Sequence, residues 1–361
     1  MIQDFFIAHS YLIGLISFAI GLLGMPLVVR IAKAKGLVVR PNKRMSHSGD
    51  VPNIGGLNIC FSFMLTYLLF EYDQLSQSQF FLIGLFAIMV VGFIDDILVL
   101  TPTAKLLGEA LAGIALIGFA DMRITHLHGI FGIEQISTIP SYALSLFVLI
   151  AIINAVNLID GIDGLASGLG ILYCLFFALY FGLAGDMSWS ILAICMIGSL
   201  AVFFIYNVFG HREKIFMGDS GSLLLGYLLT TFVFHFCEEN AYHEVPEWLH
   251  MNAAPAVAIC VLTVPIFDTI RVSLTRIKQR RSPFQPDKNH IHHLLLRTGL
   301  NHIQTTCVLL TVSLVFIGLA ILGRNWNFWL LLTADFALAT CLTLILWHIL
   351  NKILYGPNAD S

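Results

Sequence analysis

Long apolar stretches recur along the whole chain, and they constrain the fold more than any other feature. Each is near 20 residues, enough to cross about 30 Å of hydrocarbon as an α-helix. Because lipid offers no hydrogen bonds to the backbone, such stretches are expected to be helical. Of the 361 residues 58% are hydrophobic and only 11% are charged, roughly half the charge of an ordinary soluble domain. We therefore predict an all-α polytopic integral membrane protein that forms a single transmembrane domain over residues 1–361.

The apolar runs and the polar breaks between them predict about eleven transmembrane helices. The expected starts lie near residues 8, 54, 79, 104, 141, 165, 188, 220, 253, 305 and 327. The first run follows Asp4 rather than a basic segment and continues to about Arg30, so we interpret it as a retained span and not as a signal peptide. The segment between Arg123 and Pro140 is too polar to cross a membrane, and we predict a short hairpin there on the outer side.

The charges of the polar breaks alternate along the chain. Lys and Arg concentrate in one set of breaks, around residues 33–44, 212–214 and 276–297, and Asp and Glu in the other set. Cytoplasmic loops of membrane proteins are the basic ones, so eleven spans put the N-terminus outside and the C-terminus in the cytoplasm. Tryptophans then fall at the outer interface, as an aromatic belt would: Trp189, Trp248, Trp326 and Trp329.

Net charge and cysteine spacing limit the partners. The net charge of −3 gives no argument for nucleic acid as a partner. The seven cysteines are scattered through apolar segments with no CxxC pair, so we interpret them as small buried hydrophobic residues and not as zinc ligands. Membrane lipid is the partner that the composition itself requires.

The first polar motif is the pair Asp95 and Asp96, which ends the third predicted span on the cytoplasmic side. Consecutive helical positions point about 100° apart, so the two carboxylates need not share one role. One could face a metal or a phosphate while its neighbour faces another group. A solvated acidic pair at the membrane surface is the alternative interpretation.

The second motif is the segment Asn154–Leu165, NAVNLIDGIDGL, in which polar residues recur every three positions. If the segment is helical, these residues form one polar stripe. Their carboxylates and carboxamides supply oxygen ligands for Mg²⁺, or acceptors for a sugar or a base. A helix-capping loop with incidental acids is the alternative. The members of the stripe are Asn154, Asn157, Asp160 and Asp163.

The third motif, Phe216–Ser222 (FMGDSGS), immediately precedes the eighth predicted span. A glycine-rich turn that enters a helix presents free backbone N–H groups and the positive end of the helix dipole, which favours phosphate oxygens. Asp219 would then hold a metal that neutralises the phosphate charge. A simple N-cap at Asp219 or Ser220 is the alternative, and it is compatible with catalysis.

The fourth motif, Ser282–His293 (SPFQPDKNHIHH), lies in the longest basic loop and contains His290, His292 and His293. The pattern HxHH by itself suggests a transition-metal site. We favour a diphosphate instead, because Arg280, Arg281, Lys288 and Arg297 crowd the same loop and disfavour a cation. Incidental surface histidines are the remaining interpretation.

These four motifs, in this order, resemble those of the polyprenyl-phosphate N-acetylhexosamine-1-phosphate transferases, also known as glycosyltransferase family 4. The resemblance runs from about Arg44 to Leu300, and His47–Gly56 resembles the family's nucleotide-side loop. Within the family, the histidine segment is more similar to the enzymes that use UDP-GlcNAc than to the phospho-MurNAc-pentapeptide translocases, which usually carry a PIHHH form.

The resemblance implies a multi-pass enzyme of the bacterial inner (cytoplasmic) membrane with its active site at the cytoplasmic face. It would transfer GlcNAc 1-phosphate from UDP-GlcNAc to undecaprenyl phosphate, release UMP, and so form the first lipid-linked intermediate of a surface polysaccharide such as O antigen. Another UDP-N-acetylhexosamine as donor and a covalent aspartyl intermediate stay open. A homodimer also stays open, and a secondary transporter is the alternative from a different class.

The resemblance also implies roles for individual residues. Asp219, with Asn157, would hold Mg²⁺, for which Mn²⁺ could substitute. Asp95 or Asp96 would orient or deprotonate the acceptor phosphate. The other expected site residues are Asp160 and Asp163 for nucleotide-sugar binding and site electrostatics, Phe216 for stacking on uracil, and Arg44, His47, Asn154, His290, His292 and His293 for further substrate contacts.

The chain departs from the family pattern near the paired Asp. A looser family pattern has a third acid soon after the pair, where this chain has Ile97, Leu98 and Val99, so a third metal carboxylate is not expected there. A Lys-to-Gln spacing in the family is Lys105 to Glu109 here, and at i,i+4 these two residues could simply pair with each other. Intramembrane acids are functional candidates by default, and Glu109, Asp268 and Asp335 fall in this class. Satisfied polar groups within the helix bundle are the alternative interpretation for Asp268 and Asp335.

Overall fold

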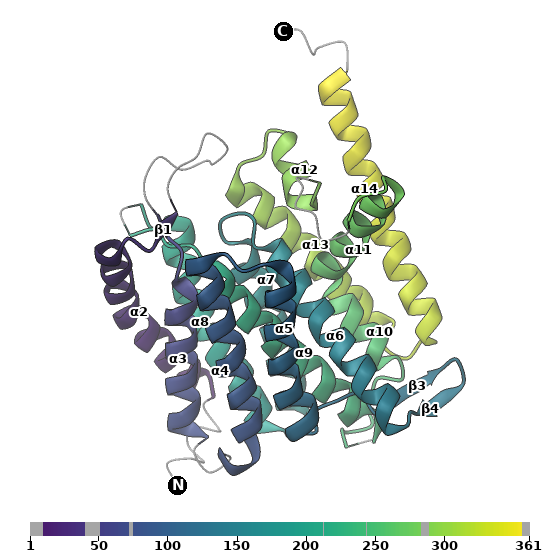
Figure 1. Cartoon of the computed structure of the whole chain (residues 1–361). Coiled ribbons are helices and arrows are strands. Elements are labelled where there is room, and N and C mark those ends of the chain that lie inside the picture. The colour runs from purple at the N-terminus through teal and green to yellow at the C-terminus, as the bar shows by residue number, and fades with distance from the viewer. Residues whose placement is uncertain are drawn as a thin grey trace.

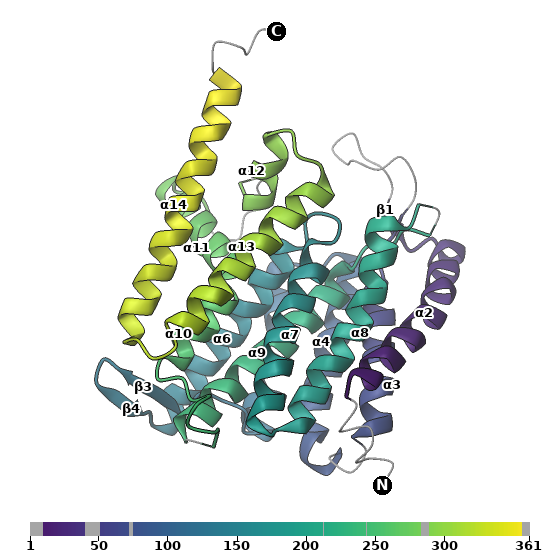
Figure 2. The ribbon, with the colours of Figure 1, turned by 180° about the vertical axis from the view of Figure 1, so that it is seen from behind.

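The computed structural model describes residues 10–39, 51–71, 75–211, 213–242, 244–282 and 289–355. Within these ranges the chain is a bundle of long helices with two small two-stranded sheets (Figures 1 and 2). The helices are α2 (Ser10–Lys35), α3 (Gly55–Phe70), α4 (Leu75–Leu98), α5 (Pro102–Gly113) with the π-helical η2 (Ile114–Phe119), α6 (Thr138–Ile159), α7 (Leu165–Ala184), α8 (Met187–Phe209), α9 (Gly218–Ala241), α10 (Ala254–Val261), α11 (Thr263–Lys278), α12 (Ile291–Arg297), α13 (His302–Leu322) and α14 (Phe328–Tyr355).

The helices of the bundle start close to the positions that the sequence predicts for spans. In the described part of the chain, nine helices are long and apolar enough to cross a membrane. α3 has only 16 residues, and α10 and α11 together give a tenth span only if they are counted as one, since they are bent by 82°. The all-α polytopic fold is therefore confirmed, whereas the number eleven is not.

The bend between α10 and α11 has a local cause. Pro265 lies in the first turn of α11, and a proline lacks the N–H for an intrahelical bond while its ring clashes with the carbonyl of the residue four positions earlier. That residue is Val261, where α10 ends. The proline therefore interrupts the helix at this point, and α11 continues at an angle of 82° to α10.

α9 is the central helix, with 94% of its most apolar window buried inside the protein. Small residues let the other helices come close: a Cβ on Gly226 would lie 2.7 Å from Cα of Ile153 in α6. The hydroxyls of Thr230 and Thr231 donate to carbonyls one turn earlier in α9, so its polar side chains need no partner in lipid. Closely packed membrane helices commonly have small residues of this kind at their interfaces.

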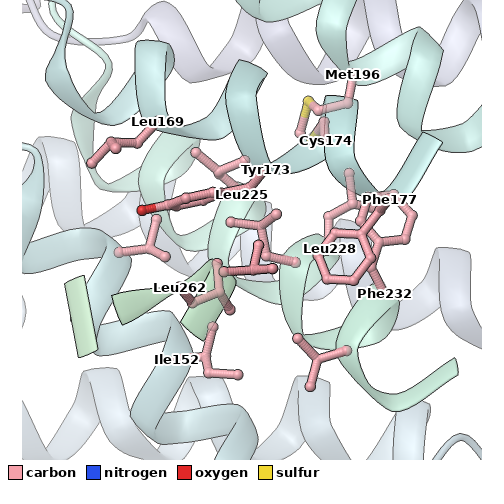
Figure 3. Packing of buried hydrophobic residues seen from close by; sticks show 14 of the residues in the cluster. Ile152, Leu169, Tyr173, Cys174, Phe177, Met196, Leu225, Leu228, Phe232 and Leu262 are labelled. Atoms are coloured by element: carbon pink, nitrogen blue, oxygen red, sulfur yellow. The ribbon is translucent and has the colours of Figure 1, made fainter. Parts of the chain in front are cut away.

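Large apolar side chains fill the space between α9 and its neighbours. Figure 3 shows Phe177 from α7 beside Leu228 and Phe232 from α9. The rings of Phe177 and Phe232 have centroids 5.5 Å apart. This packing fixes the positions of the helix ends that carry the polar motifs.

The two ends of the bundle carry different small elements. The strands β1 (Val38–Val39) and β2 (Val51–Pro52) lie with α12 at one end, and the hairpin of β3 (His126–Ile130) and β4 (Ile133–Gln135) lies at the opposite end (Figures 1 and 2). The hairpin predicted between Arg123 and Pro140 is confirmed. Gly129 and Gly132 adopt positive φ in its turn, a conformation that glycine accepts without steric cost.

Candidate active site

The C-terminal ends of α4 and α6 meet the N-terminal ends of α5, α7 and α9 at the end of the bundle that carries β1 and α12. Side chains of Asp96, Lys105 and Asn157 all contact the first turn of α9. The convergence of the polar motifs expected from the topology is thus present in the structure.

Asp96 caps α9 rather than facing an open site. Its carboxylate accepts from the backbone N–H groups of Asp219 (2.7 Å) and Ser220 (3.1 Å), from the Ser220 hydroxyl (2.7 Å) and from the Asn53 amide (3.1 Å). Gly218, at φ +71°, lies so close that a Cβ there would be 2.6 Å from this carboxylate. The prediction that these N–H groups are free for phosphate is therefore wrong, because a carboxylate from α4 already occupies the helix N-terminus.

Asp95, the neighbour of Asp96, faces a different group. One of its oxygens accepts from the backbone N–H of Leu100 (2.6 Å), and the other lies 3.2 Å from the ammonium of Lys105. The prediction that the pair divides into two roles is consistent with this geometry, since consecutive positions on a helix point to different sides.

Lys105 lies at the centre of the oxygen cluster. Its ammonium donates to Asp219 Oδ1 at 2.8 Å and to Asn157 Oδ1 at 3.2 Å, in addition to its contact with Asp95. The amide of Asn157 also donates to Asp219. Lys105 therefore pairs with three partners from α4, α6 and α9, and the expected i,i+4 pair with Glu109 is not what the side chain forms.

Glu109 is fully buried one turn further along α5. Its Oε2 accepts from the amide of Asn154 at 2.6 Å, and its Oε1 has no hydrogen-bond partner within the part of the chain that the structure describes. Asn154 is thereby tied to Glu109 and to the carbonyl of Ile150 within its own helix. Asn154 is half-buried, and its bond to Glu109 links α6 to α5 beside the cluster.

The polar stripe predicted for residues 154–163 does not form as one stripe. α6 ends at Ile159, so only Asn154 and Asn157 share a helical face, and Asp160 and Asp163 lie in the turn before α7. Gly164, at φ +77°, begins α7 in a conformation that glycine accepts most readily. Its N–H donates to Asn207 of α8 at 2.6 Å, which anchors the turn.

The carboxylate of Asp160 is half-buried at the C-terminal end of α6. Burial, and next the charges of Asp219, Asp96 and Asp163, together raise the pKa of Asp160 to about 7. The charged form is disfavoured in this position because removal from water and like charges both oppose it. Asp160 is thus poised to gain or lose a proton near neutral pH.

Asp163 has the opposite environment. Its Oδ2 accepts from Lys214 at 2.7 Å and from His302 Nδ1 at 2.9 Å. Burial acts to raise the pKa of Asp163, but the bonds from His302 and Lys214 outweigh it, and the net pKa lies below the usual value. Lys214 also lies 5.8 Å from the ring centre of Phe216, so this cation joins the turn at Asp163 to the predicted uracil-stacking residue.

The histidine segment reaches the same turn through His292. A Cβ on Gly161 would lie 2.2 Å from Nε2 of His292, so the imidazole packs directly on the backbone of the second motif. Neither ring nitrogen of this buried histidine has a hydrogen-bond partner among the described residues. Burial, and next the charge of His293, lowers the pKa of His292 to about 3, so the ring is neutral.

His290 is held differently from His292. Its Nδ1 lies 2.8 Å from Asp268, and Asp268 also accepts from Arg271 (2.7 Å) and from the N–H of Ile291 (3.0 Å). Asp268 is therefore a satisfied polar group that fixes the histidine segment against α11. His293 packs against His292 with ring centres 4.2 Å apart and ring planes tilted by 51°, and it remains half-buried.

The donors around Lys105 suit a hard divalent cation. Asp95 and Asp219 provide carboxylate oxygens and Asn157 a carboxamide oxygen, the ligand types that Mg²⁺ prefers. The ammonium of Lys105 now lies among these oxygens, which shows that the cluster stabilises positive charge. The predicted metal residues Asp219 and Asn157 are thus in contact, and Asp95 joins them.

Two of the predicted site residues, Arg44 and His47, lie outside the described residues. The sequence did not indicate several other residues that contribute to this region. Asn53, Lys214, Asn207 and His302 each bond to a predicted motif from a distant part of the chain. Asn53 lies within the segment that resembles the nucleotide-side loop, which was the only available signal. The other three had no local signal, because single polar residues near span ends are common.

Comparison with known proteins adds a family assignment to this geometry. The family model for glycosyl transferase family 4 matches residues 78–236, a range that contains the first three motifs. The undecaprenyl-phosphate alpha-N-acetylglucosaminyl 1-phosphate transferase of Haemophilus influenzae is 33% identical over 311 residues, which is 84% of each chain. Proteins of the same name from Pasteurella multocida (31%, 83% of each chain) and Yersinia pestis (29%, 83% of this chain and 80% of that protein) are also similar.

Proposed function

The chain belongs to glycosyl transferase family 4, and from that premise we propose that it transfers GlcNAc 1-phosphate from UDP-GlcNAc to undecaprenyl phosphate and releases UMP. The observation that carries the proposal is the cluster of Asp95, Asp219 and Asn157 around Lys105 at one end of a membrane helix bundle. The names of its relatives, which specify an undecaprenyl-phosphate acceptor and an N-acetylglucosaminyl 1-phosphate group, support the choice of substrates.

We place this cluster at the cytoplasmic face of a bacterial inner membrane. The loops at this end of the bundle carry most of the Lys and Arg residues, and basic loops face the cytoplasm. If α3 and the bent pair α10–α11 are each counted as a crossing, the total is eleven, with the N-terminus outside and the C-terminus inside. A soluble nucleotide sugar and a lipid phosphate could both reach a site in this position.

Mg²⁺ is the cation that we assign to the oxygen cluster, with Mn²⁺ as a substitute. Asp219, Asn157 and Asp95 would hold it, and it would neutralise charge on the diphosphate of the donor. Lys105 would keep these carboxylates together before the donor binds and would contribute a second positive charge to the phosphates. The buried pair Glu109 and Asn154 would hold α5 and α6 at the distance that this cluster requires.

The reaction that we propose is a direct in-line transfer. A phosphate oxygen of the acceptor forms a bond to the phosphorus that carries the sugar, the bond from this phosphorus to the bridging oxygen breaks, and its electron pair leaves with UMP. Asp95 is the better placed of the two acids to orient the acceptor or accept its proton, because Asp96 is committed to the cap of α9. Transfer of this kind depends mainly on positioning and charge stabilisation.

The turn at 160–163 and the histidine segment would bind the donor. Phe216, next to Lys214, offers a ring for stacking on uracil, and Asp163 holds that lysine in place. The unpartnered ring nitrogens of His292 are available to the diphosphate or the sugar, and His293 lies beside it. His290 we assign to positioning, since Asp268 already accepts its bond.

The isoprenoid tail of the acceptor needs an apolar path that ends near the cluster. A cavity of about 210 Å³ lies between α11, α13 and α14 and is lined by apolar side chains such as Phe267, Leu309 and Phe316. Ile291 of the histidine segment and Asp268, which binds that segment, also line it. We propose that lipid occupies this space.

The test is transfer of label from UDP-GlcNAc, labelled in the sugar, into butanol-extractable lipid by the purified protein with undecaprenyl phosphate and Mg²⁺. The expected result is labelled lipid with one UMP released per sugar transferred, and a strongly reduced rate of both with Asp219→Asn. Activity only with another UDP-N-acetylhexosamine would move the assignment to that donor. Absence of transfer with every donor would overturn the proposal and favour a transporter.

A further inference from the structure

A second group of ligand-type side chains lies at the end of the bundle opposite to the active site. We propose that Asp186, His235 and Glu239 form a binding site for a transition-metal dication such as Zn²⁺. His235 is sixteen positions beyond Asp219 on α9, about 24 Å at the rise of an α-helix. The proposed site is therefore separate from the oxygen cluster and does not depend on the transfer reaction.

The spacing of the donor atoms fits one metal ion. One donor atom from each of the three residues lies within 4.8 Å of the others. His235 Nε2 is 2.9 Å from Asp186 Oδ2 and 3.6 Å from Glu239 Oε1. Ligands bound at about 2.0–2.2 Å in tetrahedral geometry are roughly 3.3–3.6 Å apart, so only small shifts are needed.

The ligands are held in place by groups that do not bind the metal. The imidazole of His235 stacks on Trp189 with ring centres 4.0 Å apart and an interplanar angle of 15°. Asp186 caps α8 by accepting from the N–H of Trp189 with Oδ1, which leaves Oδ2 toward His235. His235 and Glu239 are four positions apart on α9 and so share one face.

The burial of Glu239 is a second observation that indicates a bound cation at this position. Glu239 is 6% exposed, and its Oε2 has no hydrogen-bond partner in the described ranges. Among the residues that the structure describes, no Lys or Arg pairs with Asp186 or Glu239, and the only basic group between them is His235. A buried carboxylate without compensation is costly, and a dication bound between the two carboxylates would offset that cost.

The chemistry of the donors selects the class of metal, and the cavity beside them provides access. An imidazole nitrogen with carboxylate oxygens suits Zn²⁺ and related ions, whereas Mg²⁺ prefers oxygen alone. Asp186 and Trp189 line a cavity of about 320 Å³ that also contacts Tyr67 and Ser188. An ion can therefore reach the carboxylate of Asp186 without disturbance of the helix packing.

The experiment uses the full-length protein in detergent, stripped of metals with a chelator and titrated with Co²⁺ in excess Mg²⁺. We expect one Co²⁺ per chain by elemental analysis, with visible d–d absorption that Zn²⁺ abolishes. His235→Gln and Glu239→Gln should each weaken binding about tenfold or more. Asp219→Asn should keep the cobalt spectrum, which separates this site from the oxygen cluster.

A matched control and a folding measurement complete the test. Asp121→Asn removes an exposed carboxylate in the connection that leads to the β3–β4 hairpin, at the same end of the bundle, and should change nothing. Zn²⁺ should raise the melting temperature of the wild type and of Asp121→Asn, and not that of the two ligand variants. The proposal is overturned if the wild type binds no Co²⁺, or if the ligand variants, with melting temperatures near wild type without metal, bind it equally well.

Discussion

The carboxylates at the two ends of α9 have different kinds of partner. At the N-terminal end the protein supplies fixed positive partners: helix N–H groups for Asp96 and the ammonium of Lys105 for Asp95 and Asp219. At the C-terminal end the imidazole of His235 is the only basic group between Glu239 and Asp186 among the described residues. The acids at the N-terminal end are therefore already paired before a charged substrate binds. The acids at the C-terminal end remain available to an added cation.

Neighbouring acids in one motif can have unrelated roles. Asp96 stabilises the fold by capping α9, whereas Asp95 and Asp219 face the position where phosphate is expected. A carboxylate that accepts several charge-assisted hydrogen bonds has little freedom for chemistry. The partners of each acid, more than its place in a motif, indicate what it does.

The largest expected effect tests the N-terminal end directly. Asp219→Asn and Asp95→Asn should each lower kcat of transfer by about 100- to 1000-fold, because each removes a charge that the transition state requires. Asp219→Asn should also raise the Mg²⁺ concentration needed for half-maximal rate. The measurement is initial transfer rate over a Mg²⁺ titration, and near wild-type rates for both variants at saturating Mg²⁺ would contradict the assignment.

The second prediction separates Asp96 from Asp95. Asp96→Asn should destabilise the protein by about 1.5–3 kcal/mol, because an amide cannot replace all the bonds that the carboxylate accepts at the start of α9. Asp95→Asn should change stability less. Thermal unfolding of both variants in the same detergent gives the comparison. Equal losses of stability would show that the capping role is shared.

The sequence predicts the helices, the hairpin at 126–135 and the meeting of the four motifs at one end, because these follow from hydropathy and loop charge. It does not predict what each acid contacts. The cap at Asp96 and the triple contact of Lys105 depend on how α4, α5 and α9 pack, and no local pattern encodes that. The stripe at 154–163 fails at Asp160 because α6 ends at Ile159.

The group of Asp186, His235 and Glu239 illustrates the same limit. His235 and Glu239 have the spacing of two ligands on one helix, but the third ligand, Asp186, comes from the turn before α8. Two ligand-type residues at i,i+4 are common in helices, and only the third makes the group distinctive. That third residue becomes visible when the turn between α7 and α8 is placed beside α9.

The third prediction uses a histidine from each end. Because the pKa of His292 falls from 6.5 to about 3 on folding, the unfolded chain binds a proton between these values and the folded chain does not. Its contribution to stability is present above pH 6.5 and decreases as the pH falls toward 3, by at most about 1.4 kcal/mol per pH unit.

Unfolding midpoints of the wild type and His292→Gln at pH 7.5, 6.5 and 5.5, spaced at about one pH unit around the reference pKa of histidine, would measure this contribution. We expect the wild type to lose more stability than the variant over that range. His235→Gln serves as the matched control at the other end, where the imidazole lies between carboxylates. A pH dependence that is the same in the wild type and His292→Gln would show that folding does not lower the pKa of this ring.

The smallest expected effect asks whether the two ends are independent. Glu239→Gln and Asp186→Asn should leave the transfer rate within about twofold of wild type, because substitutions more than roughly 10 Å apart without shared partners usually do not couple. Asn can still cap α8 at position 186, so that variant also preserves the helix start. The measurement is the transfer rate of each variant with and without added Zn²⁺. The contrary result is a loss of tenfold or more in the wild type without Zn²⁺ and in both variants, with Zn²⁺ restoring the rate of the wild type alone. That result would show that α9 transmits the state of its C-terminal end to Asp219, so that the two ends act as one system.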